Sequence, residues 1–99
     1  MYIQTMIIEW DETKNRINQK NHGLDFELAQ QVFDDPLQIS KQDRHTNGEE
    51  RWQTLGSIGG LSILLVAHTI NDDEGNEVIR IISARKATKH EKKHYEQSN

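Results

Sequence analysis

The stretch Leu61-Ser-Ile-Leu-Leu-Val-Ala-His-Thr-Ile70 is nearly continuous apolar sequence, and it decides the fold. A run of this length, rich in aliphatic and β-branched residues, predicts the central buried strand of a sheet. Gly59-Gly60 precedes it and predicts a tight hairpin turn, because glycine accepts the positive φ angles that such turns need. An acidic turn at residues 71–77 follows, so the strand-like residues 50–58 and 78–84 would pair with the central strand on either side. The sequence therefore predicts an antiparallel meander.

A short strand and two helices are predicted ahead of this meander. Residues 6–10 predict the strand, and residues 12–21 predict a helix that is capped by Asp11 and has Ile17 as its only aliphatic residue. A helix this polar is typical of a solvated surface, or of a face that serves a ligand or partner. The second helix begins at Asp25, and its apolar residues recur at helical spacing as a core stripe formed by Phe26, Ala29, Val32 and Phe33.

The end of the chain is basic, although the formal net charge of the whole chain is −4. Residues 78–99 hold six of the twelve Lys and Arg residues but only two of the sixteen acidic residues. This asymmetry indicates a surface for phosphates or for an acidic partner. Thr88 and Glu91 have the spacing of a capping box, which predicts a terminal helix at residues 89–97. Because Tyr95 is almost the only apolar residue of that helix, we expect the helix to pack loosely in isolation.

These elements predict a single α+β domain over residues 1–99. Two N-terminal helices would pack on a small, mainly antiparallel sheet of about four to five strands, with a further short strand at residues 37–41 and a helix at the C-terminus. The chain contains no cysteine, which excludes disulfides, thiolate metal sites and a cysteine nucleophile. It shows no signal-peptide pattern and no apolar run long enough to span a bilayer, so we expect a cytoplasmic protein without membrane contact.

The predicted terminal helix carries a zinc-peptidase motif, His90-Glu91-Lys92-Lys93-His94, which would place two imidazoles and a carboxylate on one helical face. A third metal ligand normally follows on a later element, and only five residues remain after His94. Three lysines next to these histidines also oppose the capture of a dication: Lys89, Lys92 and Lys93. We therefore expect the motif to be a coincidence, and we expect no metal and no cofactor.

Arg80 stands among aliphatic residues on a predicted buried strand, where a cation is costly unless it meets an anion. Strict alternation places Ile79, Ile81 and Arg85 on one side of this strand and Arg80 and Ala84 on the other. One interpretation is that Arg80 pairs with an internal acid such as Glu50 and is structural. The other is that Arg80, Arg51 and Arg85 line an open face of the sheet and bind a phosphodiester.

Several other polar residues have a structural interpretation beside a functional one. His68 lies near the end of the central strand, where a hydrogen-bonded core histidine is more common than a general acid or base. His22 lies at a helix end, where it would cap a carbonyl group, and it shares one polar helical face with Lys14 and Asn18. Trp52 could stack on a base, although a half-buried tryptophan in a strand is more often a packing residue.

Short segments in a fixed order cover nearly the whole chain: Glu9-Trp-Asp-x-x-Lys14, Asn18, His22-Gly23, Val32-Phe-Asp-Asp-Pro36, Glu49-Glu-Arg-Trp52, Gly56, and Ile81-Ile-Ser-Ala-Arg-Lys-Ala-Thr88 through Glu91 to Tyr95-Glu96. Together they resemble the BrnT family, the toxin components of bacterial type II toxin–antitoxin pairs. The resemblance implies a RelE-like fold and a ribonuclease that cleaves RNA without metal and inhibits translation. It also implies a cognate antitoxin similar to BrnA. Because such an antitoxin binds DNA, the pair would bind operator DNA and repress its own operon.

The resemblance also carries a hypothesis about the site, because the candidate residues fall in or beside the matching segments. In this hypothesis the 2′-hydroxyl of the RNA attacks the phosphodiester, and three arginines stabilise the phosphate: Arg51, Arg80 and Arg85. Proton transfer would fall to Glu50, His22 or His68. Further contacts with the RNA would come from Lys14, Lys86 and Trp52.

Two other functions remain open on the sequence alone. The chain could be a non-catalytic binding module, or an inactivated toxin, whose polar first helix and basic last helix dock an antitoxin-like partner. A zinc hydrolase that uses His90, Glu91 and His94 is the weaker alternative, and it predicts bound zinc and activity that a chelator abolishes.

Overall fold

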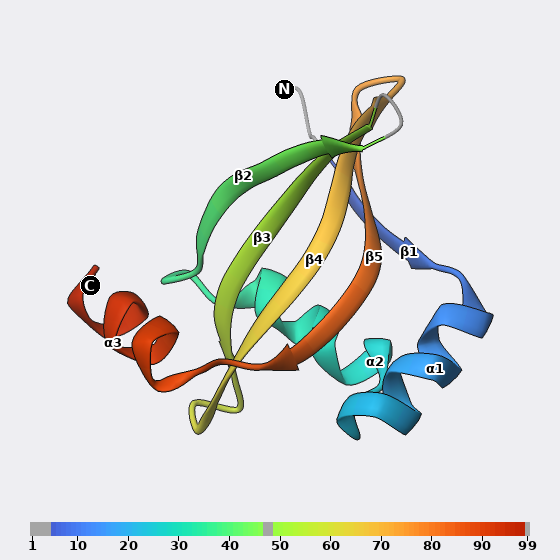
Figure 1. Cartoon of the computed structure of the whole chain (residues 1–99). Helices are drawn as coiled ribbons and strands as arrows, with labels where there is room; N and C mark the ends of the chain where they lie inside the picture. Colours follow the sequence, from blue (N-terminus) through green and yellow to red (C-terminus); the bar gives the residue numbers. More distant parts are fainter. Residues whose placement is uncertain (1–4, 47–48, 99) are drawn as a thin grey trace.

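The computed structural model describes residues 5–46 and 49–98 of the chain. Five strands form one sheet in the order β1-β5-β4-β3-β2 (Figure 1). The strands are β1 (Met6–Trp10), β2 (Ile39–Thr46), β3 (Glu49–Ile58), β4 (Ser62–Asp73) and β5 (Asn76–Lys86). Strand β4 pairs with β3 on one side and with β5 on the other, which confirms the predicted central strand.

The sheet is mixed. Strands β2 to β5 form the predicted antiparallel meander, whereas β1 runs parallel to β5, with Ile8 opposite Ile79. Strands β4 and β5 are longer than the sequence predicted, because the acidic segment at residues 71–77 is mostly strand. Only Glu74 and Gly75 form the turn, and both have positive φ angles, as a two-residue hairpin requires.

The helices are α1 (Glu12–His22), α2 (Phe26–Ala29), the 3₁₀ helix η1 (Gln30–Asp34) and α3 (Lys89–Gln97). The prediction of two N-terminal helices is only partly correct, because the second is a single α-helical turn that continues as η1. The end of η1 lies directly before Asp35-Pro36, where proline disfavours a further helical conformation. Within the described residues, none of these helices combines the length and apolarity needed to cross a membrane.

Two groups of apolar residues cover the two faces of the sheet. The larger group lies on what we call the covered face, and it joins the sheet to the segment from Leu24 to η1: Leu24, Phe26, Ala29, Val32, Phe33, Leu64, Val66, Ile79, Ile81 and Ala84. The smaller group lies on the opposite, open face, where α3 packs at one end of the sheet: Leu55, Leu65, Ala87 and Tyr95. Figure 1 shows α3 and α1 at opposite ends of the molecule.

A β-bulge in β5 changes which side chains share a face. Ala67 pairs with Ser83, but His68 pairs with Ile81, so β5 has one extra residue at this point. The alternation predicted from the sequence is therefore wrong beyond Ile82. Ala84 joins Ile79 and Ile81 in the core of the covered face, and Arg85 lies opposite Leu65 on the open face together with Arg80.

The polar helix α1 is held to the sheet by amide side chains rather than by an apolar stripe. Asn18 is buried, and its Nδ2 group donates to the carbonyl oxygens of Leu24 and Ala84, both at 2.9 Å. Its Oδ1 atom accepts from the backbone N–H of Ala84 at 3.0 Å. Asn15 is also buried and accepts from the backbone N–H of Phe26 at 2.8 Å. Asn18, which the sequence placed on a polar face with Lys14 and His22, is therefore a docking residue.

A glycine allows η1 to approach the sheet closely. Gly56 lies in β3, and a Cβ atom at this position would lie 2.6 Å from Cγ1 and 2.9 Å from the carbonyl oxygen of Val32. Both distances are shorter than van der Waals contact, so any side chain at position 56 would force η1 away from β3.

We predict that Asn18→Ala destabilises the protein by about 3 kcal/mol, because it removes three hydrogen bonds and leaves buried backbone groups of β5 without partners. Urea unfolding followed by circular dichroism measures the change. The matched control is Asn21→Ala, which removes an exposed asparagine from the same helix and should change the stability by less than about 0.5 kcal/mol. Equal effects of the two variants would contradict the docking role of Asn18.

Candidate active site

Two arginines share a row that crosses the open face of the sheet. In the register of β3, β4 and β5, Arg51 is the partner of Thr69, and Thr69 is the partner of Arg80. The Cα atoms of the two arginines are thus two strand spacings apart, roughly 10 Å. Because directly opposed residues point to the same side of a sheet, both guanidinium groups reach the open face. Arg51 and Arg80 are two of the three arginines that the sequence grouped as a phosphate site, the third being Arg85.

Neither of these guanidinium groups forms an ion pair with an acidic side chain in the part of the chain that the structure describes. The side chain of Arg80 is exposed, and Glu9 is its neighbour across the β1–β5 pair. Arg51 is half-buried, and its Nε atom is shielded from solvent without a hydrogen-bond partner. A buried donor of this kind is costly unless a ligand or water completes it, so the arrangement favours an anion on this row.

Glu50 and Trp52 lie on the other side of β3 from Arg51, because neighbouring residues of a strand point to opposite faces. Trp52 is opposite the buried His68, and Glu50 is opposite His45 on β2. The suggested pairing of Glu50 with Arg80 therefore does not fit the register of the sheet.

Arg85 forms a two-pronged ion pair with Glu91 of α3. Its Nη1 and Nη2 groups donate to the two carboxylate oxygens of Glu91 at 2.8 and 3.0 Å. The hydrogen bond with Glu91 is the main reason that the pKa of Arg85 is raised, and the same bond lowers the pKa of Glu91 to about 2. Arg85 is therefore joined to α3, whereas no ion pair links Arg51 or Arg80 to another residue of the described ranges. Lys86 is exposed and lies opposite Leu64, on the covered side of the sheet.

The structure places the two candidate histidines of the sequence away from this row. His68 is buried in the covered face, where its Nε2 atom lies 2.7 Å from the hydroxyl oxygen of Thr54 and its ring meets the edge of Phe33. Burial lowers the pKa of His68. His22 and Lys14 are both exposed on α1, and the Asn18 contact holds this helix beside β5.

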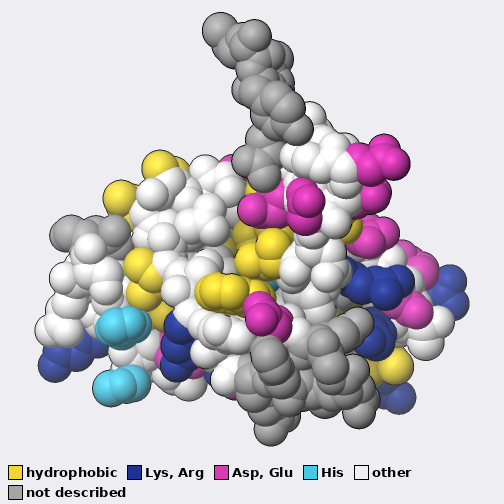
Figure 2. All heavy atoms as spheres, turned by 90° about the horizontal axis from the view of Figure 1, so that it is seen from above, with side chains coloured by type: hydrophobic (Ala, Val, Ile, Leu, Met, Phe, Trp, Pro, Cys, Tyr) yellow, Lys and Arg dark blue, Asp and Glu magenta, His cyan; other side chains and the backbone are white. Residues whose placement is uncertain are grey.

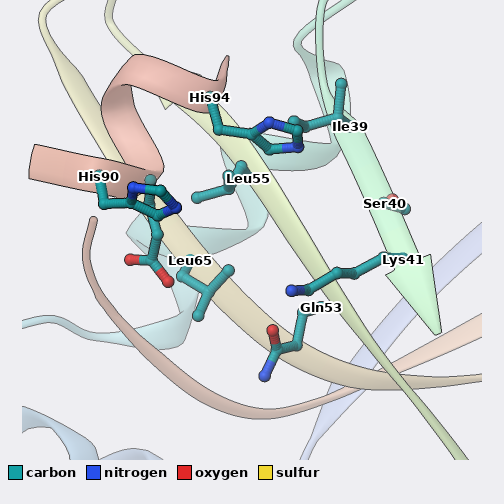
Figure 3. Close-up of a pocket in the computed structure, with 9 residues that line it drawn as sticks. Ile39, Ser40, Lys41, Gln53, Leu55, Leu65, His90 and His94 are labelled. Atoms are coloured by element: carbon teal, nitrogen blue, oxygen red, sulfur yellow. The ribbon is translucent and has the colours of Figure 1, made fainter. Parts of the chain in front are cut away.

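A cavity of about 300 Å³ lies between α3 and the open face (Figure 3). The strands contribute Ile39, Ser40, Lys41, Gln53, Leu55 and Leu65, and α3 contributes His90, Glu91 and His94. The imidazoles of His90 and His94 extend from α3, and the side chains of Lys41 and Gln53 reach the same space from β2 and β3 (Figure 3).

The sequence analysis did not predict that Lys41, Gln53 and the two α3 histidines line a common cavity. The only signal was the spacing of His90 and His94, which puts both on one helical face and which we explained as a chance zinc motif. No group of three His, Cys, Asp or Glu side chains among the described residues is arranged to hold a metal ion. Seen from above, two histidine side chains lie at the left of the surface, whereas acidic side chains gather at the right, where Lys and Arg side chains also lie (Figure 2).

The helix α3 is fixed at both ends rather than loosely packed. At its start, Thr88 and Glu91 form the predicted capping box. Near its end, Tyr95 is buried, and its hydroxyl donates to Asp35 at 2.5 Å. The same carboxylate oxygen accepts from the backbone N–H of Ser57 at 2.8 Å. Burial and the bond to Asp35 raise the pKa of Tyr95 to about 12. These contacts hold α3 over the cavity.

The comparisons with known proteins give a consistent family assignment. The model of the family described as "Ribonuclease toxin, BrnT, of type II toxin-antitoxin system" matches residues 10–91, a range that includes Arg51, Arg80 and Arg85. The chain belongs to the BrnT family. The resemblance drawn from the sequence motifs is thereby confirmed.

A solved structure also resembles this BrnT-family chain. It is the 1.1 Å crystal structure of the Brucella abortus ribonuclease toxin BrnT, with a TM-score of 0.59 and 29% sequence identity. The similarity covers 87% of the present chain and 100% of the Brucella chain. A comparison with curated proteins finds no match. The α+β architecture, with its five-stranded sheet and C-terminal helix, is thus that of a BrnT toxin.

We predict that the Arg85–Glu91 pair makes the docking of α3 sensitive to acid. The pKa of Glu91 is lowered from 4.5 to about 2, mainly by the hydrogen bond from Arg85. Since the folded pKa lies below the unfolded one, this stabilisation is complete above about pH 4.5 and is lost as the pH falls towards about 2. Between about pH 4.5 and about pH 2, the free energy of unfolding in urea should therefore fall less in Glu91→Gln than in the wild type.

The control for this measurement is Glu96→Gln, which neutralises an exposed carboxylate of the same helix. It should follow the wild-type pH profile. If Glu91→Gln also follows that profile, the ion pair does not stabilise α3.

Proposed function

We propose that this chain is a ribonuclease toxin that cleaves RNA on the open face of its sheet, in the manner of a RelE-like enzyme. The observation that carries the proposal is the row of Arg51, Thr69 and Arg80, in which two cations that pair with no acid among the described residues lie on one uncovered surface. Membership of a family described as ribonuclease toxins supports RNA as the substrate.

We infer that cleavage proceeds without a metal ion. A general base takes the proton of the ribose 2′-hydroxyl, whose oxygen attacks the adjacent phosphorus, and the pentacovalent phosphate gains negative charge. The bond from phosphorus to the 5′-oxygen then breaks to leave a 2′,3′-cyclic phosphate, and a general acid protonates the departing 5′-oxygen. Guanidinium groups can stabilise that charge directly, because each presents several N–H donors in a fixed plane to phosphate oxygens. In this proposal Arg51 and Arg80 hold the phosphate from two sides, and electrostatic stabilisation with alignment of the 2′-hydroxyl supplies most of the rate.

Proton transfer is assigned in this proposal to the α3 histidines. His90 and His94 are exposed, they line the cavity above the open face, and imidazole exchanges protons near neutral pH. His68 is less suited to this role, since it is buried on the covered face and bonded to Thr54. Arg85 has a positioning role, because it holds α3 in place through Glu91.

The biological role proposed here is that of the toxin in a type II pair. Cleavage of RNA would inhibit translation, and a cognate antitoxin similar to BrnA would bind and neutralise the chain. An antitoxin with a DNA-binding domain would also bring the complex to operator DNA and repress the operon. Membership of a family of type II toxins supports the existence of a protein antitoxin.

We predict that the purified chain cleaves RNA in excess EDTA and that Arg80→Ala lowers the rate about 100-fold, because the variant removes one donor from the developing phosphate charge. Arg51→Ala should have an effect of similar size. Gel analysis of a labelled RNA, with and without the antitoxin, measures both the rate and its neutralisation.

The control is Arg16→Ala, which removes an exposed arginine of α1 and leaves the open face unchanged. Its rate should stay within about threefold of the wild type, because it does not touch the phosphate. Equal rates for Arg80→Ala and the wild type would remove Arg80 from the site. Activity that EDTA abolishes would refute the metal-free mechanism, and tight antitoxin binding with no cleavage of free or ribosome-bound RNA would favour a binding module.

A further inference from the structure

We propose that the cavity beneath α3 binds one unpaired base of the RNA, next to the phosphate held by Arg51 and Arg80, and thereby sets the base preference of cleavage. The inference rests on the proposed ribonuclease function, and it adds a binding site for a base to the proposed binding site for the phosphate. It concerns the cavity lined by residues of β2, β3, β4 and α3.

The cavity is adjacent to the arginine row on the same face of the sheet. Gln53 lies two residues after Arg51 on β3, so both side chains point to the open face, and their Cα atoms are roughly 7 Å apart. Along an extended RNA strand, this is a distance that one nucleotide can cover. A phosphate on the row therefore leaves the adjoining base within reach of the cavity.

The lining suits a planar heterocycle with polar edges. Leu55 and Leu65 form an apolar floor, and a volume of about 300 Å³ is at the small end of the range for ligand sites. Gln53 supplies an amide that can donate and accept, and Lys41 supplies a donor. In the described part of the chain the amide oxygen of Gln53 accepts no hydrogen bond, and its nitrogen makes only a long contact of 3.5 Å to Asp43.

The charges around the cavity suit an anionic ligand such as RNA better than a basic protein segment. The carboxylate of Glu91 is already neutralised by Arg85 and also accepts from the backbone N–H of Thr88 at 2.9 Å, so it does not repel a nucleotide. Lys41 is the remaining charged group of the lining. Hydrogen bonds to the edges of unpaired bases are typical of single-stranded RNA recognition.

The first test is the base composition at the cut sites of a random-sequence RNA. Wild-type chain should cut next to a preferred base, and Gln53→Leu should reduce the discrimination between bases by about tenfold, because the amide no longer reads the base edge. The matched control is Gln42→Leu. Gln42 is exposed, lies next to Lys41 on β2 and points to the opposite side of the sheet, so the wild-type preference should persist. No preference in the wild type, or an unchanged one in Gln53→Leu, would overturn the inference.

A binding measurement keeps this inference separable from the ribonuclease proposal. In an NMR titration with the four nucleoside 5′-monophosphates, at least one should shift the signals of Lys41 and Gln53, and Gln53→Leu should weaken its binding about fivefold. Ribose 5-phosphate and inorganic phosphate, which occupy only the arginine row, should shift these signals much less than that nucleotide does. If the nucleotides bind in a base-dependent way but the chain cleaves no RNA, the base pocket is supported and the proposed ribonuclease activity is rejected. The base pocket would be rejected if ribose 5-phosphate shifted the signals of Lys41 and Gln53 as much as the nucleotides do. It would also be rejected if the antitoxin shifted these signals and none of the nucleotides did.

Discussion

The side-chain amide of Asn18 bonded to both backbone groups of Ala84 is the contact on which the arrangement of the molecule depends. Strand β1 ends at Trp10 beside Ile81, so the next outward-facing backbone groups of β5 have no strand next to them. The amide supplies one acceptor and one donor in the way that a neighbouring strand would. It also joins the carbonyl of Leu24, so a single residue fixes α1, the turn after it and the edge of β5.

The position of β5 that Asn18 fixes also decides which side chains reach the open face of the sheet. Asn18 holds β5 two residues beyond the bulge, where the strand has shifted its alternation by one position. As a result Ala84 faces the core while Arg85 faces Glu91, so β5 contributes to the core, to the arginine row and to the attachment of α3. The proposed separation of roles follows from this geometry. Arg51 and Arg80 remain available for a phosphate, whereas Arg85 is used to position the helix above the cavity.

Much of the fold could be predicted from the sequence, because hydrophobic periodicity and turn residues are local signals. The central strand, the Gly59-Gly60 hairpin and the capping box of α3 belong to this class. The parallel pairing of β1 and the bulge after Ile81 depend on contacts between distant residues, which no local pattern reports. For the site, the sequence grouped Arg51, Arg80 and Arg85 on one open face, and the register places all three side chains there. Gln53 and Lys41, in contrast, look like ordinary polar strand residues, because the cavity arises only where α3 packs above them.

The long separation of the stabilising contacts along the chain also constrains the order of folding. Asn18 and Ala84 are 66 residues apart, and Asp35 and Tyr95 are 60 residues apart. Such non-local contacts form only after the entropy of closing long loops has been overcome, which slows folding and makes it depend on nearly the full chain. A growing polypeptide on the ribosome therefore cannot assemble the cavity before the residues of α3 have been synthesised.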